Sequence, residues 1–358
     1  MQSRSLGMQV AAALILFGEL LIPHRFSGAG AQTFLVASPG SFPGSPAIAG
    51  HLVVWTSSPP GWQARRLPGS AIYGKDLSTG RRFRVTGQGT AVGRPAISGA
   101  VVVWVDCRHC TAGHGLGYRE TEIYGKDLAT GRTFPVAAQP GDQAAPAISP
   151  SIVVWQERRD GHTAIQGKNL ATGWRFRVGR QSGDQAAPSI SGHIVVWQER
   201  LGDTADIFGE DLSTGRLFPV ALHAGASDVL RDPIISGHWV VWVDWNGGDE
   251  PATVVSMDLT IGRSLPITTI PYGHFNPQLG PDIALSGHIV VWDAAERAAF
   301  GNTNYDIHGM DLATGRRFQV TSDPHDQILP AISGTTVVWD DARGGRWAIY
   351  GTHLPPTG

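Results

Sequence analysis

The sequence contains little charge of either sign. Among its 358 residues, 28 are Lys or Arg and 30 are Asp or Glu, which leaves a formal net charge of -2. No basic field is therefore present to hold a polyphosphate backbone, and this excludes nucleic acid as a partner. Charged residues amount to 16% and hydrophobic residues to 42%. This balance supports a large core and excludes a disordered chain.

Residues that favour long helices are also scarce, and long apolar runs are absent. Gly occurs 46 times and Pro 24 times, together about a fifth of the chain. Because helices accommodate these two residues worst, long uninterrupted helices are excluded. The apolar run that begins at Met8 is interrupted by Glu19, short of the ~20 residues that a membrane-spanning helix needs. We expect no membrane span in the mature chain.

The common catalytic motifs are missing as well. The sequence has no Gly-x-Ser-x-Gly elbow, no phosphate-binding loop and no His-Glu-x-x-His motif. It therefore predicts no catalytic residue and no cofactor, and it favours a binding protein over an enzyme.

The first 31 residues have the pattern of a secretion signal. Arg4 supplies a positive charge, residues 8–17 form an apolar segment, and residues 29–31 (Ala-Gly-Ala) provide a small-residue cleavage site. We therefore expect an exported protein, located in the periplasm, at the cell surface or outside the cell. The mature part, residues 32–358, is predicted to be a single domain.

A Val-Val-Trp tripeptide recurs at intervals of about 47 residues, a period typical of β-propeller blades. Each copy carries four pieces in the same order: a Pro-x-Ile-Ser-Gly segment, a β-branched run ending in Trp, a run like residues 123–128, and a run like residues 82–85. All are short, rich in Val, Ile, Phe and Tyr, and bounded by turn residues, which predicts four strands per copy. The repeated Trp residues, which we expect in the core, are Trp55, Trp104, Trp155, Trp197, Trp242, Trp292 and Trp339.

Two turns in each copy are short and nearly uniform. The first is typified by Ser-Gly-His at residues 191–193 and the second by Ser-Thr-Gly-Arg at residues 78–81. A Gly at a fixed place in each predicts a positive φ. The His residues that follow the first turn are expected at the surface rather than in a cluster: His51, His193, His238 and His288. The Asp residues before the second turn are expected to bond nearby backbone groups: Asp76, Asp127, Asp211, Asp258 and Asp311.

The seventh copy has no fourth strand of its own after residues 348–354. A matching piece occurs at the other end of the chain, where residues 33–37 (Thr-Phe-Leu-Val-Ala) resemble the fourth strand at residues 133–137 (Thr-Phe-Pro-Val-Ala). We therefore predict an all-β fold, a seven-bladed β-propeller of four-stranded antiparallel blades. Radial packing buries the sheets, and the N-terminal strand is expected to close the ring by joining the C-terminal blade.

These motifs resemble the TolB-like β-propeller superfamily, and especially the repeat propellers of uncharacterised bacterial cell-surface proteins. The resemblance is carried by residues 123–128, 206–212 and 306–312 and covers residues 32–358. It implies an exported propeller that binds protein partners, as TolB does. The chain departs from TolB in having seven units instead of six and no separate N-terminal α/β domain. The resemblance therefore implies the fold and not a role in the Tol-Pal system.

The two rims of such a propeller differ in this sequence. The rim with the first-to-second and third-to-fourth connections is uniform; we call the other, with the second-to-third and fourth-to-first connections, the variable rim. Binding residues concentrate on such varied loops, where aromatics beside Arg suit a sugar ring or a protein hot spot. The alternative is that these aromatics pack their own loops onto the ring. The candidates are Trp62, Arg65, Arg66, Tyr118, Arg119, Trp245, Asp249, Tyr272, His274, Phe275, Arg297 and Phe300.

Two smaller patterns leave alternatives open. An Asp-Gln pair occurs at residues 142–143, 184–185 and 326–327, either as oxygen ligands for a cation at the axis or as turn-stabilising residues between blades, which we favour. Cys107 and Cys110 are followed by His114. For an exported chain a local disulfide is the favoured state of this pair, ahead of free thiols and of a zinc site, whose usual spacing is longer.

Two functions are consistent with these observations. The first is a non-catalytic propeller that binds a protein or a cell-envelope glycan on its variable rim. The second is a polysaccharide lyase or glycoside hydrolase at the axial mouth of the same rim, with His274 or His114 as base beside Asp249, or with two carboxylates. A pair of carboxylates facing a deep axial pocket favours the enzyme, and a shallow aromatic rim favours the binding protein.

Overall fold

The computed structural model of the protein is all-β. It describes residues 32–38, 42–58, 70–87, 90–112, 118–179, 183–223, 229–245, 251–270, 282–297 and 303–355. Within these ranges the helical structure is one short 3-10 turn, Arg343–Gly345. None of the described helices is long and apolar enough to cross a membrane. The predicted secretion signal lies outside the described residues.

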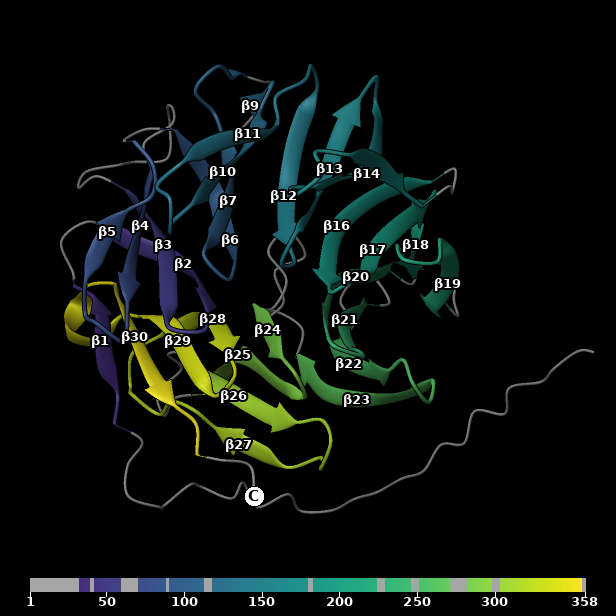
Figure 1. The fold of residues 1–358 in the computed structure, drawn as a ribbon. Coiled ribbons are helices and arrows are strands. Elements are labelled where there is room, and N and C mark those ends of the chain that lie inside the picture. The colour runs from purple at the N-terminus through teal and green to yellow at the C-terminus, as the bar shows by residue number, and fades with distance from the viewer. Residues whose placement is uncertain are drawn as a thin grey trace, which may run out of the picture.

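The strands form four-stranded antiparallel units that follow the sequence repeats (Figure 1). The prediction of four short antiparallel strands per repeat is therefore confirmed. Units 1 to 3 consist of β2 (Phe42–Ala49), β3 (Leu52–Ser58), β4 (Ala71–Asp76) and β5 (Arg82–Arg84); β6 (Ala91–Ser98), β7 (Val101–Asp106), β10 (Glu122–Asp127) and β11 (Thr133–Ala137); and β12 (Asp142–Ile148), β13 (Ile152–Arg159), β14 (His162–Asn169) and β15 (Arg175–Val178).

The remaining units repeat this order of strands. They consist of β16 (Asp184–Ser191), β17 (Ile194–Leu201), β18 (Thr204–Asp211) and β19 (Arg216–Ala221) in unit 4; β20 (Val229–Ser236), β21 (Trp239–Trp245), β22 (Ala252–Asp258) and β23 (Arg263–Ile270) in unit 5; β24 (Ile283–Ser286), β25 (Ile289–Arg297), β26 (Thr303–Asp311) and β27 (Arg317–Gln319) in unit 6; and β28 (Gln327–Ser333), β29 (Thr336–Asp341), β30 (Ala348–His353) and β1 (Phe34–Ala37) in unit 7. Units 4 and 5 share one parallel bridge, between Ala205 and Val229, and so form one eight-stranded sheet. A two-stranded ribbon, β8 (Thr111–Ala112) with β9 (Tyr118–Arg119), extends between β7 and β10.

Unit 7 takes its fourth strand from the start of the described chain. Strand β1 pairs antiparallel with β30, with Phe34 opposite Gly351 and Leu35 opposite Tyr350. Val36 is fully buried, whereas Leu35 on the other face is 39% exposed. The alternation follows from the period of two along a strand, and it fits the strand predicted for residues 33–37.

The core lies between successive units, which follow one another around a common centre (Figure 1). Each hydrophobic cluster of the described residues combines side chains from two units, as where Val154 of unit 3 packs with Trp197 of unit 4. One cluster joins the last unit to the first through Val36, Trp55 and Ile349. The seven repeated Trp residues are at most 5% exposed, so their prediction as core residues is confirmed. Burying a large aromatic side chain stabilises the fold by about 2 kcal/mol or more.

In units 4 to 7 the first turn bonds to the first turn of the next unit. The Oγ of Ser191 accepts the N–H of Gly237 at 2.9 Å, and the Oγ of Ser333 accepts the N–H of Gly50 at 2.9 Å. Gly237 has a φ of 60°, a region that favours glycine. The Ser-Gly pair is therefore repeated because Ser links the units and Gly permits the turn.

The second turn is held by the Asp that precedes it. The Oδ1 of Asp76 accepts the N–H of Ser78 at 2.9 Å, and the hydrogen bonds from Ser78 lower the pKa of Asp76 to about 2. Asn169 holds the same place in unit 3 and accepts the N–H of Ala171 at 2.9 Å. The predicted backbone bonding of the repeated Asp residues is thus confirmed.

A glycine in the third strand of most units lies against a Phe ring of the neighbouring fourth strand. A Cβ added at Gly209 would stand 2.6 Å from the ring of Phe218, and one at Gly351 would stand 2.8 Å from the ring of Phe34. Such a distance is too short for carbon atoms. The glycine therefore provides the space in which the ring packs.

Replacing Gly209 with Ala is expected to lower the free energy of unfolding by about 2 kcal/mol, because the ring of Phe218 has to move out of a packed position. The matched control is Gly87→Ala, since no heavy atom lies within 4 Å of a Cβ added there. Urea unfolding measures both variants. An equal effect of the two substitutions would contradict the packing role of Gly209.

Candidate functional site

The first strand of most units is bulged at the residue that precedes the repeated Pro. Five such residues in the described chain have a positive φ, between 47° and 57°. The antiparallel register shifts at the same place, as between Ala186 and Ser189 of β16. A bulge re-aims the side chain that it carries. The five residues are Ser45, Ala145, Ala187, Asp232 and Leu329.

Two other units carry charged residues at the equivalent position. They are Arg94 in β6 and Asp282, which directly precedes β24. The guanidinium of Arg94 donates to a carboxylate oxygen of Asp282 at 3.1 Å. These residues belong to units 2 and 6, and the first strands contact one another in the order β24, β28, β2 and β6. The bond between Arg94 and Asp282 therefore joins two units that do not follow one another around the common centre.

Two more carboxylates approach from second strands, each directly after a repeated Trp. Asp293 of β25 accepts the backbone N–H groups of Asp282 and Leu329, both at 3.2 Å. Asp340 of β29 accepts the N–H of Ser45 at 3.2 Å. The bonds from Leu329 and Ser45 come from the bulge of the following unit. These carboxylates therefore connect neighbouring units at the centre.

We call these four carboxylates and one guanidinium the central cluster: Arg94, Asp232, Asp282, Asp293 and Asp340. Burial raises the pKa of Asp282, and the charge of Asp232 adds to this effect. Burial and the charge of Asp282 raise the pKa of Asp293 to about 7. Burial raises the pKa of Asp340 to about 8. The common cause is the loss of water around the ionised carboxylates.

The carboxylates of the central cluster differ in their exposure to solvent. The side chains of Asp232 and Asp282 are 49% and 28% exposed, whereas Asp340 is 4% exposed. The Oδ1 of Asp340 has no hydrogen-bond partner within the part of the chain that the structure describes. Asp340 is the last residue but one of β29, and Asp282 directly precedes β24. Arg94, Asp232 and Asp293, however, lie in the middle of β6, β20 and β25, so the cluster is not confined to one end of the strands.

The structure shows only part of the predicted rim residues. Trp245 ends β21, is half-buried and lies opposite Val229. For Tyr118 and Arg119 in β9 and for Arg297 at the end of β25 the backbone alone is described. The other candidates lie outside the described residues: Trp62, Arg65, Arg66, Asp249, Tyr272, His274, Phe275 and Phe300. The binding role of the variable rim therefore stays a prediction.

The Asp-Gln pairs stabilise connections between units. The Oδ1 of Asp142 accepts the N–H of Glu120 at 2.8 Å, and the Oδ1 of Asp184 accepts the N–H of Thr163 at 2.8 Å. In both cases the donor belongs to the preceding unit. No group of three or more His, Cys, Asp or Glu residues in the described ranges is arranged to hold a metal ion. These contacts correspond to the turn-stabilising role of the pairs, and not to the alternative role as cation ligands at the axis.

Two turn His residues lie at the surface beside Asp side chains, and the two Cys residues are bonded to each other. The side chain of His51 is 59% exposed, with its Nε2 3.9 Å from Asp76, and His238 is placed alike beside Asp258. Cys107 and Cys110 form a disulfide with their Cα atoms 4.7 Å apart, the state that the sequence favours. His114 lies outside the described residues.

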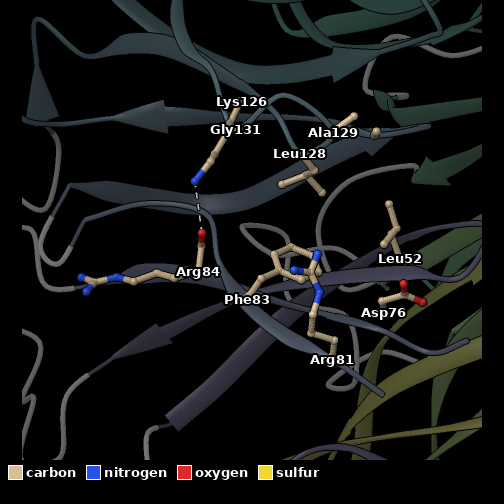
Figure 2. Close-up of a pocket in the computed structure, with 10 residues that line it drawn as sticks. Leu52, Asp76, Arg81, Phe83, Arg84, Lys126, Leu128, Ala129 and Gly131 are labelled. Carbon is tan, nitrogen blue, oxygen red and sulfur yellow. Dashed lines mark hydrogen bonds between the residues drawn. The ribbon is translucent and has the colours of Figure 1, made fainter. Parts of the chain in front are cut away.

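A surface groove of about 320 Å³ lies between units 1 and 2 on the side of the uniform turns. Figure 2 shows its lining, with the ammonium of Lys126 directed toward the backbone of Arg84. Lys126 donates to the carbonyls of Arg84 and Val85 at 3.2 and 3.1 Å. Lys168 makes the same kind of bond to Val136 of unit 2. These lysines therefore link successive units. The groove is a consequence of this repeated packing of one unit against the next.

The central cluster was not predicted from the sequence. The signal is the departure from the repeat at two inner positions, the residue before the Pro and the residue after the Trp. At the second position Thr56 and Gln156 occur in units 1 and 3, but Asp293 and Asp340 occur in units 6 and 7. A charged residue at an inner position of an otherwise uniform repeat indicates a role that the other units do not share.

No protein-family profile matches the chain, and no curated protein matches it. Among solved structures it is similar to TolB from Acinetobacter baumannii, with 18% identity and a TM-score of 0.51 over 74% of this chain and 63% of that protein. The chain thus spans less than two thirds of that TolB.

Other solved structures cover both chains more fully. An oligogalacturonate lyase from Vibrio parahaemolyticus has 12% identity and a TM-score of 0.59, over 94% of this chain and 97% of that one. The β-propeller domain of the Trilobed protease from Pyrococcus furiosus has 13% identity and a TM-score of 0.59, over 90% and 97%. At such identities the likeness concerns the fold alone. Together with the four-stranded antiparallel units, it shows that the chain has a β-propeller fold.

Proposed function

We propose that the protein is an exported, non-catalytic β-propeller that binds a protein partner or a cell-envelope glycan through its variable rim. The observation that carries this proposal is the difference between the two rims. On the uniform rim, turn residues such as Ser191 and Asp76 are bonded to the next unit or to their own turn. The variable rim has the long connections. Export rests on the predicted secretion signal.

We also propose that units 1 to 7 are seven blades in a closed ring. The contacts between the last unit and the first support this proposal. Val36 and Ile349 pack with Trp55, the turn of Ser333 bonds to Gly50, and Asp340 bonds to Ser45. Hydrophobic clusters of the same kind join all the other pairs of successive units. Equivalent turn bonds join units 4 to 7, and Asp293 makes the equivalent carboxylate bond between units 6 and 7. A closed ring leaves no sheet edge unprotected at the joint.

For the enzyme alternative, the central cluster supplies the candidate catalytic residues. Similar folds include lyases and peptidases, and the central cluster contains carboxylates with raised pKa values, a feature of catalytic sites. Asp293, with a pKa of about 7, lies beside Asp282, which is bonded to Arg94. A glycoside hydrolase using this pair is therefore the second candidate function. A lyase acting on anionic uronates is less well supported, because the acidic cluster repels such chains.

The binding proposal is tested on a glycan array and by cross-linking in envelope extract, followed by affinity measurement with the partner identified. We expect the combined substitution Trp62→Ala, Trp245→Ala and Phe275→Ala to weaken binding by about tenfold or more, since aromatic residues dominate such interfaces. The matched control is Trp174→Ala. Trp174 is 67% exposed but belongs to a turn on the uniform rim.

Retained affinity in the triple variant, or an equal loss in the control, would remove the variable rim as the binding surface. Release of reducing ends from a glycan by the wild-type chain, abolished by Asp293→Asn, would instead support the hydrolase.

A further inference from the structure

We propose that a crevice at the joint between units 7 and 1 binds a phosphate monoester of a sugar, with the phosphate on Arg82 and Arg84 and the sugar ring against Tyr73. The crevice has a volume of about 490 Å³, which is in the range of small-molecule sites. It lies between β1 of unit 7 and the strands β4 and β5 of unit 1, away from the common centre (Figure 1). Its lining includes neither the candidate rim residues nor the central cluster, so the proposal does not depend on what either of them binds.

The crevice is basic and open to solvent. Arg82 and Arg84 line it, both are exposed, and no Asp or Glu is among the described residues of its lining. Burial and the charge of Arg82 lower the pKa of Lys75, which places a third cation close by. Positive charge gathered in a concave surface attracts anions. A phosphate monoester, with a charge of about −1.5 to −2 at pH 7, matches these cations better than a single carboxylate does.

The two guanidiniums are held in place by uncharged oxygens. The Nη2 of Arg82 donates to the carbonyl of Val36 at 3.4 Å and to the Oγ of Ser38 at 3.3 Å, which both belong to the N-terminal segment of unit 7. The Nε of Arg84 donates to the carbonyl of Thr86 at 2.7 Å. A guanidinium has five N–H donors, so each keeps donors for a phosphate, to which Arg bonds bidentately. Because residues two apart in a strand lie on the same face, both side chains are directed to one side of β5.

The ring of Tyr73 is placed differently from the equivalent rings of two other units. In units 2 and 7 an Arg four residues after the repeated Trp lies over the tyrosine of the third strand, at 3.9 and 4.0 Å from the ring centre. The pairs are Arg108 with Tyr124 and Arg343 with Tyr350. Unit 1 has Pro59 at the position of this Arg, and its Tyr73 lines the crevice. An aromatic face beside two guanidiniums suits the ring of a sugar.

The acid that accompanies the stacked Arg is also replaced in unit 1. In units 2 and 7 the residue two positions after the Trp is Asp106 or Asp341, whose carboxylate accepts both the indole N–H and the guanidinium. Unit 1 has Ser57 at this position, next to the crevice that Trp55 helps to line. A carboxylate there would repel an anion. The departures of unit 1 from the repeat therefore favour an anionic ligand.

The test is calorimetric titration of the folded chain with glucose 6-phosphate. Glucose is the uncharged comparison and glucuronate the comparison with one carboxylate. We expect binding of glucose 6-phosphate and at least about tenfold weaker binding of the other two. Arg84→Gln is expected to weaken the binding of glucose 6-phosphate about tenfold, and Tyr73→Gln about fivefold. Both variants are expected to fold, because Gln319 of unit 6 and Gln166 of unit 3 hold the equivalent strand positions.

The matched control is Arg177→Gln. Arg177 is exposed in β15 and lies opposite Gln166, as Arg84 lies opposite Tyr73, so the substitution removes the same charge from an equivalent strand of unit 3. Full affinity in this variant supports the proposal. An equal loss in Arg177→Gln and Arg84→Gln would overturn it, because the attraction would then come from the charge of the whole surface. A lack of binding of glucose 6-phosphate, or equally tight binding of glucose or glucuronate, would also overturn it.

Discussion

Replacing Val36 with Asp is expected to lower the free energy of unfolding by about 4 kcal/mol or more, one of the largest effects of a single substitution in this protein. Val36 is fully buried and packs in the cluster that joins the first and last units. A carboxylate there loses its water and gains no partner. Urea unfolding followed by tryptophan fluorescence measures the change, because Trp55 belongs to the same cluster.

The matched control lies one residue away. Leu35 is on the opposite face of β1 and is 39% exposed, so Leu35→Asp is expected to change stability by less than about 1 kcal/mol. The two substitutions add the same charge to the same strand. Equally small effects would mean that β1 contributes nothing to unit 7, and the closed ring would lose its main support.

The elements that were predicted correctly from the sequence are those determined by local, repeated chemistry. Trp155 recurs as a core residue because each second strand needs a large apolar side chain between units. Gly192 recurs because its turn needs a φ of 57°. Ser191 of the same turn was predicted from the sequence only to be a turn residue. Its bond to the next unit joins residues about 46 positions apart, which a pattern within one repeat does not reveal.

The central cluster was missed for a related reason. The bond between Arg94 and Asp282 joins residues 188 positions apart, on units that do not follow one another. In the sequence each of them is one irregular residue before a regular segment. Only the arrangement of the units around a centre makes their side chains meet. The Asp-Gln pairs, by contrast, are regular in sequence and have local structural roles.

Replacing Asp340 with Asn is expected to make the protein more stable at pH 8 and its stability less dependent on pH. Burial raises the pKa of Asp340 from 3.8 to about 8, so between these values the folded state binds more protons than the unfolded state. Stability therefore falls as the pH rises from about 4 to 8, by several kcal/mol at roughly 1.4 kcal/mol for each pKa unit. Asn has no proton to lose, and its carbonyl oxygen accepts the N–H of Ser45 as the carboxylate does.

Urea unfolding of the wild type and Asp340→Asn from pH 4 to pH 8.5 distinguishes this effect from a general change in charge. The control is Asp76→Asn, which removes the same charge from an exposed turn. The pKa of Asp76 is lowered to about 2, so the stability that it contributes is present above pH 3.8 and lost as the pH falls toward 2. Asn169 already holds this turn in unit 3. The Asp76 variant is therefore expected to follow the wild type from pH 5 to 8.5, while the curve of the Asp340 variant separates from it with rising pH. Parallel curves for all three proteins would show that the carboxylate of Asp340 ionises freely, and that the centre of the fold is open to water.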